Sequence, residues 1–439
     1  MKKAILLATL FSIILMPFGV IAADYSLNDL YRIALEKSRT IDIAEDDLYI
    51  SKREKDMTKA VLMPTLSAFG THTRYSEEKT RGSTVLQPEY RNEWGLRLDQ
   101  SVSLSGREIT AYKIAKQGIT KSGFDLESVK ALYLIDVASS YYDVLNAGRA
   151  LEIAQVNVER LTKHRDAAQK RLAAGAVTKT TLLRAEAELA GSRAELIRAE
   201  NGLRLARTIL SELVEVEADF GLMDDGEAAD NVEMIESCGL SDLDCLKGLA
   251  LEARSELKAL SIQKDINTKE VDYAKGSYWP SLSIEGVYSR QEDEPVSSSF
   301  ALDERIYGGI TLDFPFFEGG LRRAEVSAAR ARTRQTEAEM FNLEKAVRVE
   351  VEQNYLNVLT TSAVLIQLKA EVEYALDNFN AVTKQFRHGL ADSVDVIDAN
   401  TLLVTSERER ANAEYLYQLA TIRLQRSTGT LLRSIAAGQ

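Results

Sequence analysis

The residues that could carry enzyme chemistry are sparse and scattered in this chain of 439 residues. The three histidines, His72, His164 and His388, lie far apart, and no second pair of metal ligands lies near the cysteines. We find no nucleophile triad and no glycine-rich loop of the kind that binds phosphate. The sequence therefore predicts a protein that is not an enzyme and that holds no cofactor and no metal.

Cys238 and Cys245 are the two cysteines of the chain. The N-terminus indicates the compartment in which they would fold. Lys2 and Lys3 precede an apolar run and small residues up to Ala23, which is typical of a secretory signal peptide over residues 1–23. The mature chain is expected to begin near Ala23 or Asp24. In an oxidising compartment a local disulfide is the first interpretation, and two unpaired thiols are the alternative.

The charge of the chain limits its partners. The formal net charge is −12, and an acidic chain is not expected to bind nucleic acid. After the signal peptide, charged residues break every apolar stretch before it could span a bilayer as a helix. A membrane contact would therefore have to be made through β-strands.

Two carboxylates, Asp395 and Asp398, stand at i and i+3 just inside a predicted helix, so they share one face. Acids in a first helical turn can simply complement the helix dipole, with Asp392 or Ser393 as the cap. If several copies surround an axis, the same two acids would instead form rings that favour cations in a narrow pore. The residues alone leave both interpretations open.

An internal repeat must position these residues. Matching residues recur at an offset of 216 in the first part of the repeat and of 214 in the later part. The matches include Pro64 with Pro280, Gly106 with Gly320, and Gly175 with Gly389. We therefore predict a first repeat over residues 24–214, a linker over 215–245, a second repeat over 246–430 and a C-terminal tail over 431–439.

Each repeat is predicted to run helix, strand, strand, long helix, return helix. Apolar residues alternate in the strands, and the long helices contain no proline. The strands are expected at about 62–74, 90–104, 279–290 and 306–317, the long helices at 107–174 and 321–388, and the return helices at 180–214 and 394–425. The leading helical regions are expected at 26–60 and 240–274, and polar loops at 75–89 and 291–305.

Four strands of this length suit tilted crossings of a bilayer, but four strands cannot close a barrel. An open edge in lipid leaves backbone groups unpaired at several kcal/mol each. Three copies would give twelve strands, whereas two would give eight, whose interior side chains fill. A polar set would then face a wet lumen: Arg97, Asp99, Ser101, Thr311 and Asp313. The alternative is a soluble antiparallel sheet with one dry face.

The interfacial aromatics of such a barrel would be Trp94, Trp279, Tyr278, Tyr307, Phe314, Phe316 and Phe317. The second strand of the later repeat ends in Phe314-Pro315-Phe316-Phe317-Glu318-Gly319-Gly320, and the corresponding junction of the first repeat, which ends at Gly106, lacks the proline. The turn between the later helices reads Phe386-Arg-His-Gly389-Leu-Ala-Asp-Ser-Val394-Asp395.

In these two motifs and in the duplicated plan, nearly the whole mature chain resembles the TolC-like family of outer-membrane efflux and secretion channels, the outer membrane efflux proteins. The resemblance implies a mostly α chain with a transmembrane β-barrel contribution: a homotrimer whose 12-stranded barrel continues into a long periplasmic α-helical tunnel. It also implies that Asp395 and Asp398 gate the periplasmic entrance, and that the turns at Gly175 and Gly389 dock a periplasmic adaptor. At the family's latch positions the chain departs, with Ala391, Phe386 and Thr181 where a basic group, a tyrosine and an acid are expected.

The resemblance implies a passive channel in the outer membrane of a Gram-negative bacterium, extending into the periplasm. Its partners would be outer-membrane lipid, a periplasmic adaptor (membrane fusion) protein and an inner-membrane pump of the RND or ABC type. The cargo of such an efflux or type I secretion system, small molecules or a secreted protein, stays open. An exported structural or adhesive coiled-coil protein without channel activity is the alternative. A periplasmic adaptor is a weaker one, because a single helical hairpin between compact β-domains would be expected for it.

Overall fold

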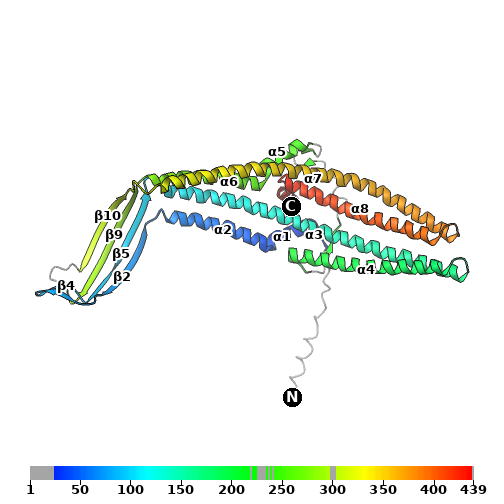
Figure 1. Ribbon diagram of the computed structural model, residues 1–439, viewed down its shortest axis with the longest axis horizontal. Coiled ribbons are helices and arrows are strands. Elements are labelled where there is room, and N and C mark those ends of the chain that lie inside the picture. The colour runs from blue at the N-terminus through cyan, green and yellow to red at the C-terminus, as the bar shows by residue number, and fades with distance from the viewer. Residues whose placement is uncertain are drawn as a thin grey trace, which may run out of the picture. The chain divides into compact units, whose positions relative to one another are not determined.

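A computed structural model describes residues 24–217, 220–224, 234–235, 238–239, 242–296 and 303–437. The predicted signal peptide, 1–23, and part of the predicted linker lie outside these residues. The described chain is mostly helical, and the order of helices and long strands in the first half recurs in the second (Figure 1). It divides into two units, of which the first is Met1–Ser38, Asp136–Asn231 and Thr361–Leu419, and the second is Arg39–Ile135, Val232–Thr360 and Ala420–Gln439.

The first half contains β1 Asp24–Tyr25, α1 Leu27–Lys37, α2 Arg39–Ala60, β2 Thr65–Arg74, β3 Lys79–Arg81, β4 Thr84–Gln87, β5 Tyr90–Ser103, α3 Arg107–Ala173 and α4 Lys179–Val214. The joining segment contains β6 Gly221–Leu222, β7 Met234–Ile235 and β8 Cys238–Gly239. The second half contains α5 Leu243–Ala253, α6 Ser255–Lys275, the 3₁₀ turn η2 Gly276–Tyr278, β9 Ser281–Glu294, β10 Glu304–Asp313, α7 Leu321–Arg387, α8 Ser393–Ser427 and α9 Leu431–Ala437.

The predicted duplication is confirmed element by element. An offset of 216 moves the bounds of α1 onto those of α5, and an offset of 214 moves those of α3 onto those of α7. The strand register repeats as well: Thr65 pairs with Asp99, and the residues 216 and 214 positions later, Ser281 and Asp313, also pair. The sequence therefore builds the same helix, strand pair and helical hairpin twice.

The leading helical regions differ from the prediction, because each is broken into two helices. The break falls at Ser38 in the first half and at Arg254 in the second, and both residues have extended backbone angles. Arg254 is buried, and its guanidinium bonds the carboxylates of Glu256 and Glu350. The break turns this side chain inward, where a continued helix would not place it. Arg426 contacts the same two carboxylates, so α6, α7 and α8 meet in one ion-pair cluster in the second unit.

Three further boundaries correct the sequence prediction. The loop expected to be irregular at 75–89 contains the short β3–β4 hairpin. The strand expected to reach residue 317 ends at Asp313, because Pro315 has no N–H for the ladder and Gly319 and Gly320 adopt positive φ. The expected tail contains α9, which begins after the left-handed turn at Gly429 and buries Leu431.

Candidate functional site

The four long strands form one antiparallel sheet in the second unit, in the order β10-β9-β5-β2 (Figure 1). Because opposed residues in such a sheet share a face, the strand register assigns each side chain to one of the two faces. Arg97 opposes Val287, which opposes Tyr307, and Ser101 opposes Ser283, which opposes Thr311. The five residues predicted to share a wet face therefore do so. Tyr307 lies on this polar face as well, so its prediction as an interfacial aromatic is wrong.

Cross-strand charge pairs cover the polar face. Arg91 contacts Asp293 through two nitrogen–oxygen pairs at 2.8 and 3.2 Å, and Arg305 contacts Glu93 at 2.9 Å. Serines and threonines fill about half of the other positions on this face, which also carries Phe69 and Val287. Paired side chains of opposite charge that stay partly hydrated suit a surface that faces water.

The opposite face is mostly apolar, and none of the other described elements covers its large side chains. Ile306 and Ile310 are 77 % and 73 % exposed. The other large apolar residues on this face are Leu66, Trp94, Leu96, Leu98, Ile284 and Leu312. The sheet also has two open edges, since β2 and β10 each pair with one strand only among the described residues. Among the described residues, the sheet thus has one apolar face, one polar face and two unpaired edges.

The strand-to-helix junctions carry the predicted glycines. Gly106 has φ of +74° between β5 and α3, and Gly319 and Gly320 have φ of +59° and +91° between Pro315 and α7. After Gly106, the Glu108 carboxylate accepts two contacts, at 3.0 and 3.1 Å, from the Ser103 N–H. Left-handed backbone at these positions requires glycine and turns each strand directly into a long helix.

The two helical hairpins of the first unit end in matched turns. The Ala176 N–H donates to Arg171 O at 2.8 Å and the Leu390 N–H donates to Gln385 O at 2.9 Å, around glycines with φ of +70° and +79°. Both are Schellman turns, in which the glycine satisfies the last carbonyls of the helix. Gly175 and Gly389 are therefore equivalent turn residues.

The structure brings Asp395 and Asp398 onto one exposed face at the start of α8. Asp395 has a second role, because its carboxylate accepts from the Asp392 N–H at 2.9 Å. Asp392 in turn accepts from the Val394 and Asp395 N–H groups at 2.6 and 3.0 Å. The two aspartates cap the helix reciprocally. Asp395 therefore has a capping role, which is separate from the predicted role in an acidic ring.

Contacts between the two hairpins were missed by sequence reasoning. The Arg171 guanidinium of α3 donates to Phe386 O of α7 at 2.6 Å and lies 4.7 Å from the Phe386 ring. The His164 Nε2 atom of α3 lies 2.8 Å from the Ser393 hydroxyl of α8. The centroids of the His164 and Phe386 rings are 4.9 Å apart. Burial lowers the pKa of His164. Because these pairs lie more than 200 positions apart, the local periodicity of helices and strands does not predict them.

Farther from the turns, Arg160 of α3 makes a two-pronged ion pair with Glu407 of α8, at 2.8 and 3.0 Å. Asn400 donates to Asn157 at 2.8 Å on the same pair of helices. The hairpins are thus joined along several turns by polar side chains. The expected latch positions contribute only Phe386, which is 2 % exposed, while Ala391 and Thr181 take no part in these contacts.

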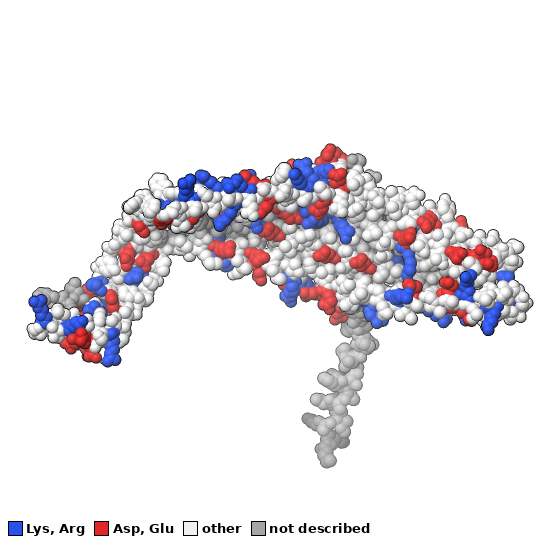
Figure 2. All heavy atoms as spheres, viewed as in Figure 1, with Lys and Arg blue, Asp and Glu red and all other residues white. Residues whose placement is uncertain are grey.

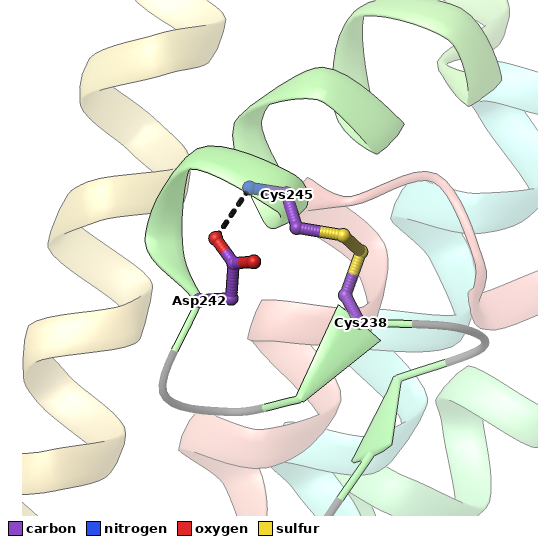
Figure 3. Close-up of a disulfide and its surroundings, with 3 residues drawn as sticks. All are labelled: Cys238, Asp242 and Cys245. Atoms are coloured by element: carbon purple, nitrogen blue, oxygen red, sulfur yellow. Dashed lines mark hydrogen bonds between the residues drawn. A yellow bond between two sulfur atoms is a disulfide. The ribbon is translucent and has the colours of Figure 1, made fainter.

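The structure joins Cys238 and Cys245 in a disulfide (Figure 3). The Asp242 carboxylate accepts from the Cys245 N–H at 2.9 Å and caps α5 inside the same loop. The bond therefore fastens the joining segment to the first turn of α5. Among the described residues, no group of three or more potential ligands could hold a metal ion, and no helix there is long and apolar enough to cross a bilayer.

These features define a class: a duplicated helical-hairpin chain with an amphipathic four-stranded sheet. Comparison with known proteins gives the family. The family model described as outer membrane efflux protein matches residues 30–214 and 246–430. The chain belongs to the outer membrane efflux protein family, as the sequence motifs predicted.

Individual relatives are distant. The outer membrane protein TolC of Escherichia coli is 22 % identical over 309 residues, which cover 68 % of this chain and 61 % of that protein. The alkaline protease secretion protein AprF of Pseudomonas aeruginosa is 22 % identical over 97 % of this chain and 89 % of its own length. A solved structure of CusC, described as forming a transmembrane channel, superposes with a TM-score of 0.81 at 16 % identity, covering 93 % of both chains. The likeness to CusC establishes the fold.

Proposed function

We propose that the protein is the outer-membrane exit channel of an efflux or type I secretion system, working as a homotrimer. The single observation that supports this most is the sheet, which has one polar face, one apolar face and two open edges. Three copies would supply twelve strands and close the edges, with the polar face around water and the apolar face against outer-membrane lipid.

The proposed channel is passive and sits in the outer membrane of a Gram-negative bacterium. Its helices extend into the periplasm, where the turns at Gly175 and Gly389 meet a periplasmic adaptor protein. An inner-membrane pump of the RND or ABC type supplies the energy. The cargo is either small molecules or a secreted polypeptide, and AprF is an example of a relative named for protein secretion. Lys and Arg alternate with Asp and Glu over most of the helices in view in Figure 2, and the net charge of −12 does not favour nucleic acid as a partner.

At the periplasmic entrance, Asp395 and Asp398 would form two acidic rings about the trimer axis. Such rings favour cations in a narrow pore. Replacing both by alanine should lower the preference for cations and weaken block by divalent ions. Because Asp395 also caps α8, Asp398→Asn alone is the cleaner test of the electrostatic role, with Asp392→Ala as a control for loss of the cap. Unchanged conductance and block in Asp398→Asn would remove the gate from the proposal.

Single-channel recording in planar bilayers tests the function itself. The purified mature protein should insert and conduct ions in steps of fixed size. Stable trimers that never conduct would favour the alternative, an exported structural or adhesive coiled-coil protein. A protein that stays in the soluble periplasmic fraction would overturn both the location and the channel.

A further inference from the structure

Four helices of the second unit border one cavity beside the sheet. α2, α3, α6 and α7 are in series with β2, β5, β9 and β10, respectively (Figure 1). Neighbouring helices touch in the same order, through Lys130 with Glu45, Arg107 with Tyr273, and Asn267 with Thr336. A cavity of about 640 Å³ is lined by all four helices. A single layer of helices can line one cavity only where the layer curves around it, so this hollow lies on the concave side of the layer.

Small side chains make the floor of the hollow, and acids surround it. Five alanines line the floor: Ala111, Ala115, Ala274, Ala328 and Ala329. Glu54 of α2, Glu270 of α6 and Glu325 of α7 line the hollow as well. They lie six, five and four residues from the sheet-proximal ends of their helices, a spread of about 3 Å at the helical rise per residue. The hollow therefore combines a small apolar floor with carboxylates at one level.

These three acids differ from other acids of the same helices because they are unpaired. Glu45, Glu337 and Glu352 each contact a lysine of another helix, at 2.9, 3.3 and 2.7 Å. None of the three acids of the hollow forms an ion pair with a described residue. Elsewhere the layer uses its acids to join helices, whereas here their charge is left facing the cavity.

Two arginines also border the hollow, but both lie away from the level of the acids. Arg107 is the first residue of α3, and its guanidinium lies over the Tyr273 ring at 4.3 Å. Arg332 lies seven residues beyond Glu325 on α7, about 10 Å along the helix. Neither arginine forms an ion pair with a described residue. The carboxylates outnumber the arginines, and they form a separate level between them.

The internal repeat duplicates this arrangement. An offset of 216 places Glu54 on Glu270, and an offset of 214 places Ala115 on Ala329. Both repeats thus contribute the same acid and the same floor residue to one hollow. In a trimer, six equivalent glutamates would surround the axis at one level, with three further carboxylates from Glu325 beside them.

We infer that the hollow is a contact site for cargo and that it takes organic cations with a compact apolar body. Its volume is in the range of pockets that hold small organic molecules. Unpaired carboxylates attract a positive charge, and the alanine floor accepts apolar groups. A bare metal ion fits less well, because among the described residues no group of three or more ligands converges to hold one. The inference rests on the proposed channel, in which the concave side of the layer faces the tunnel, and it names a class of cargo.

Block by tetraphenylphosphonium, a permanently charged cation with four apolar rings, tests the site. In planar bilayers it should reduce the single-channel current of the unmodified protein. Glu54→Gln with Glu270→Gln should raise the half-blocking concentration by about tenfold, because the paired acids of both repeats are removed. Tetraphenylborate has the same shape and the opposite charge, so it should block neither protein.

The matched control variant is Glu45→Gln with Glu337→Gln. It removes the same charge from acids that are ion-paired and lie outside the hollow. Its half-blocking concentration should stay within about twofold of the unmodified value, because distant charges are screened by salt. An equal loss of block in this control would show that the cation responds to the charge of the whole tunnel, which would overturn the site.

A second variant separates the hollow from its charge. Ala328→Leu fills the floor and leaves every charge in place, so it should also raise the half-blocking concentration, while potassium conductance changes little. Ala328 is exposed, so the larger side chain should not destabilise the layer. Unchanged block in Ala328→Leu, or in Glu54→Gln with Glu270→Gln, would overturn the site and leave the proposed function standing. If the unmodified protein forms no pores, the proposed function fails and this inference fails with it.

Discussion

The two helical hairpins have the same backbone and different chemistry. Their turns form the same hydrogen bonds around Gly175 and Gly389, but the helices that follow begin differently. Asp392 and Asp395 cap α8 reciprocally, whereas the Thr178 hydroxyl bonds the Thr180 and Thr181 hydroxyls and makes no capping bond to the backbone of α4. The turns of the two repeats thus have the same geometry, whereas the side chains that flank them differ. Of the two helices that follow the turns, only α8 begins with capping carboxylates.

Beside the turns, the contacts between the hairpins are one-sided as well. Arg171 and His164 belong to the first hairpin, and they hold Phe386 and Ser393 of the second. The equivalents of Arg171 and His164 in the second repeat are Gln385 and Asn378, which cannot supply a cation. Beside the turns, the first hairpin therefore supplies the cation and the imidazole of these contacts, and substitutions at equivalent positions measure this asymmetry.

The largest effect is expected from Arg171→Ala. It removes a charged donor from Phe386 O and a cation from the ring, together worth about 2 to 3 kcal/mol. Hydrogen exchange of the amides near residues 384–395 should quicken by about thirtyfold or more. The equivalent substitution Gln385→Ala, at an exposed position, should cost less than about 0.5 kcal/mol. Equal effects would show that Arg171 does not join the hairpins.

Gly175→Ala and Gly389→Ala should destabilise their turns equally, by about 1 kcal/mol each, because both glycines have positive φ. Neither position crowds an added Cβ, since the nearest contact is Arg171 Nη2 at 3.6 Å from Gly389. Thermal unfolding and local hydrogen exchange measure the cost. A clear difference between the two variants would contradict the equivalence of the turns.

Asp392→Ala should cost about 1 kcal/mol, the usual loss on removing a helix cap. Thr178→Ala at the equivalent cap should change stability much less, since Thr178 makes no capping bond. Hydrogen exchange in the first turns of α8 and α4 compares them directly. Similar losses in both would mean that the capping bonds do not distinguish the hairpins.

The smallest effect is a pH dependence from His164. Burial lowers its pKa in the folded state below the ordinary 6.5, so the unfolded chain binds the proton more readily. Stability is therefore full above about pH 6.5 and falls as the pH drops below that value toward the folded pKa. The hairpin contact should loosen between pH 7.5 and 5.5, and His164→Gln should flatten this dependence. An identical slope in the variant would assign it to other groups.

The fold was largely predictable because its signals are periodic and repeated. Alternation identified four strands, proline-free runs identified α3 and α7, and the constant offsets identified the duplication. The breaks at Ser38 and Arg254 were not predictable, since neither position carries proline or glycine and the second depends on a buried ion-pair cluster. Arg171 was missed for a similar reason: its role depends on a contact 215 positions away.

The central claim is that one chain supplies only part of a wall and that three copies complete it. Native mass spectrometry of the mature protein, released from detergent micelles, tests this most directly by counting chains. The account predicts a species of three chains that persists at low protein concentration, with no stable monomer. A monodisperse monomer, or an assembly of any other number of chains, would contradict it.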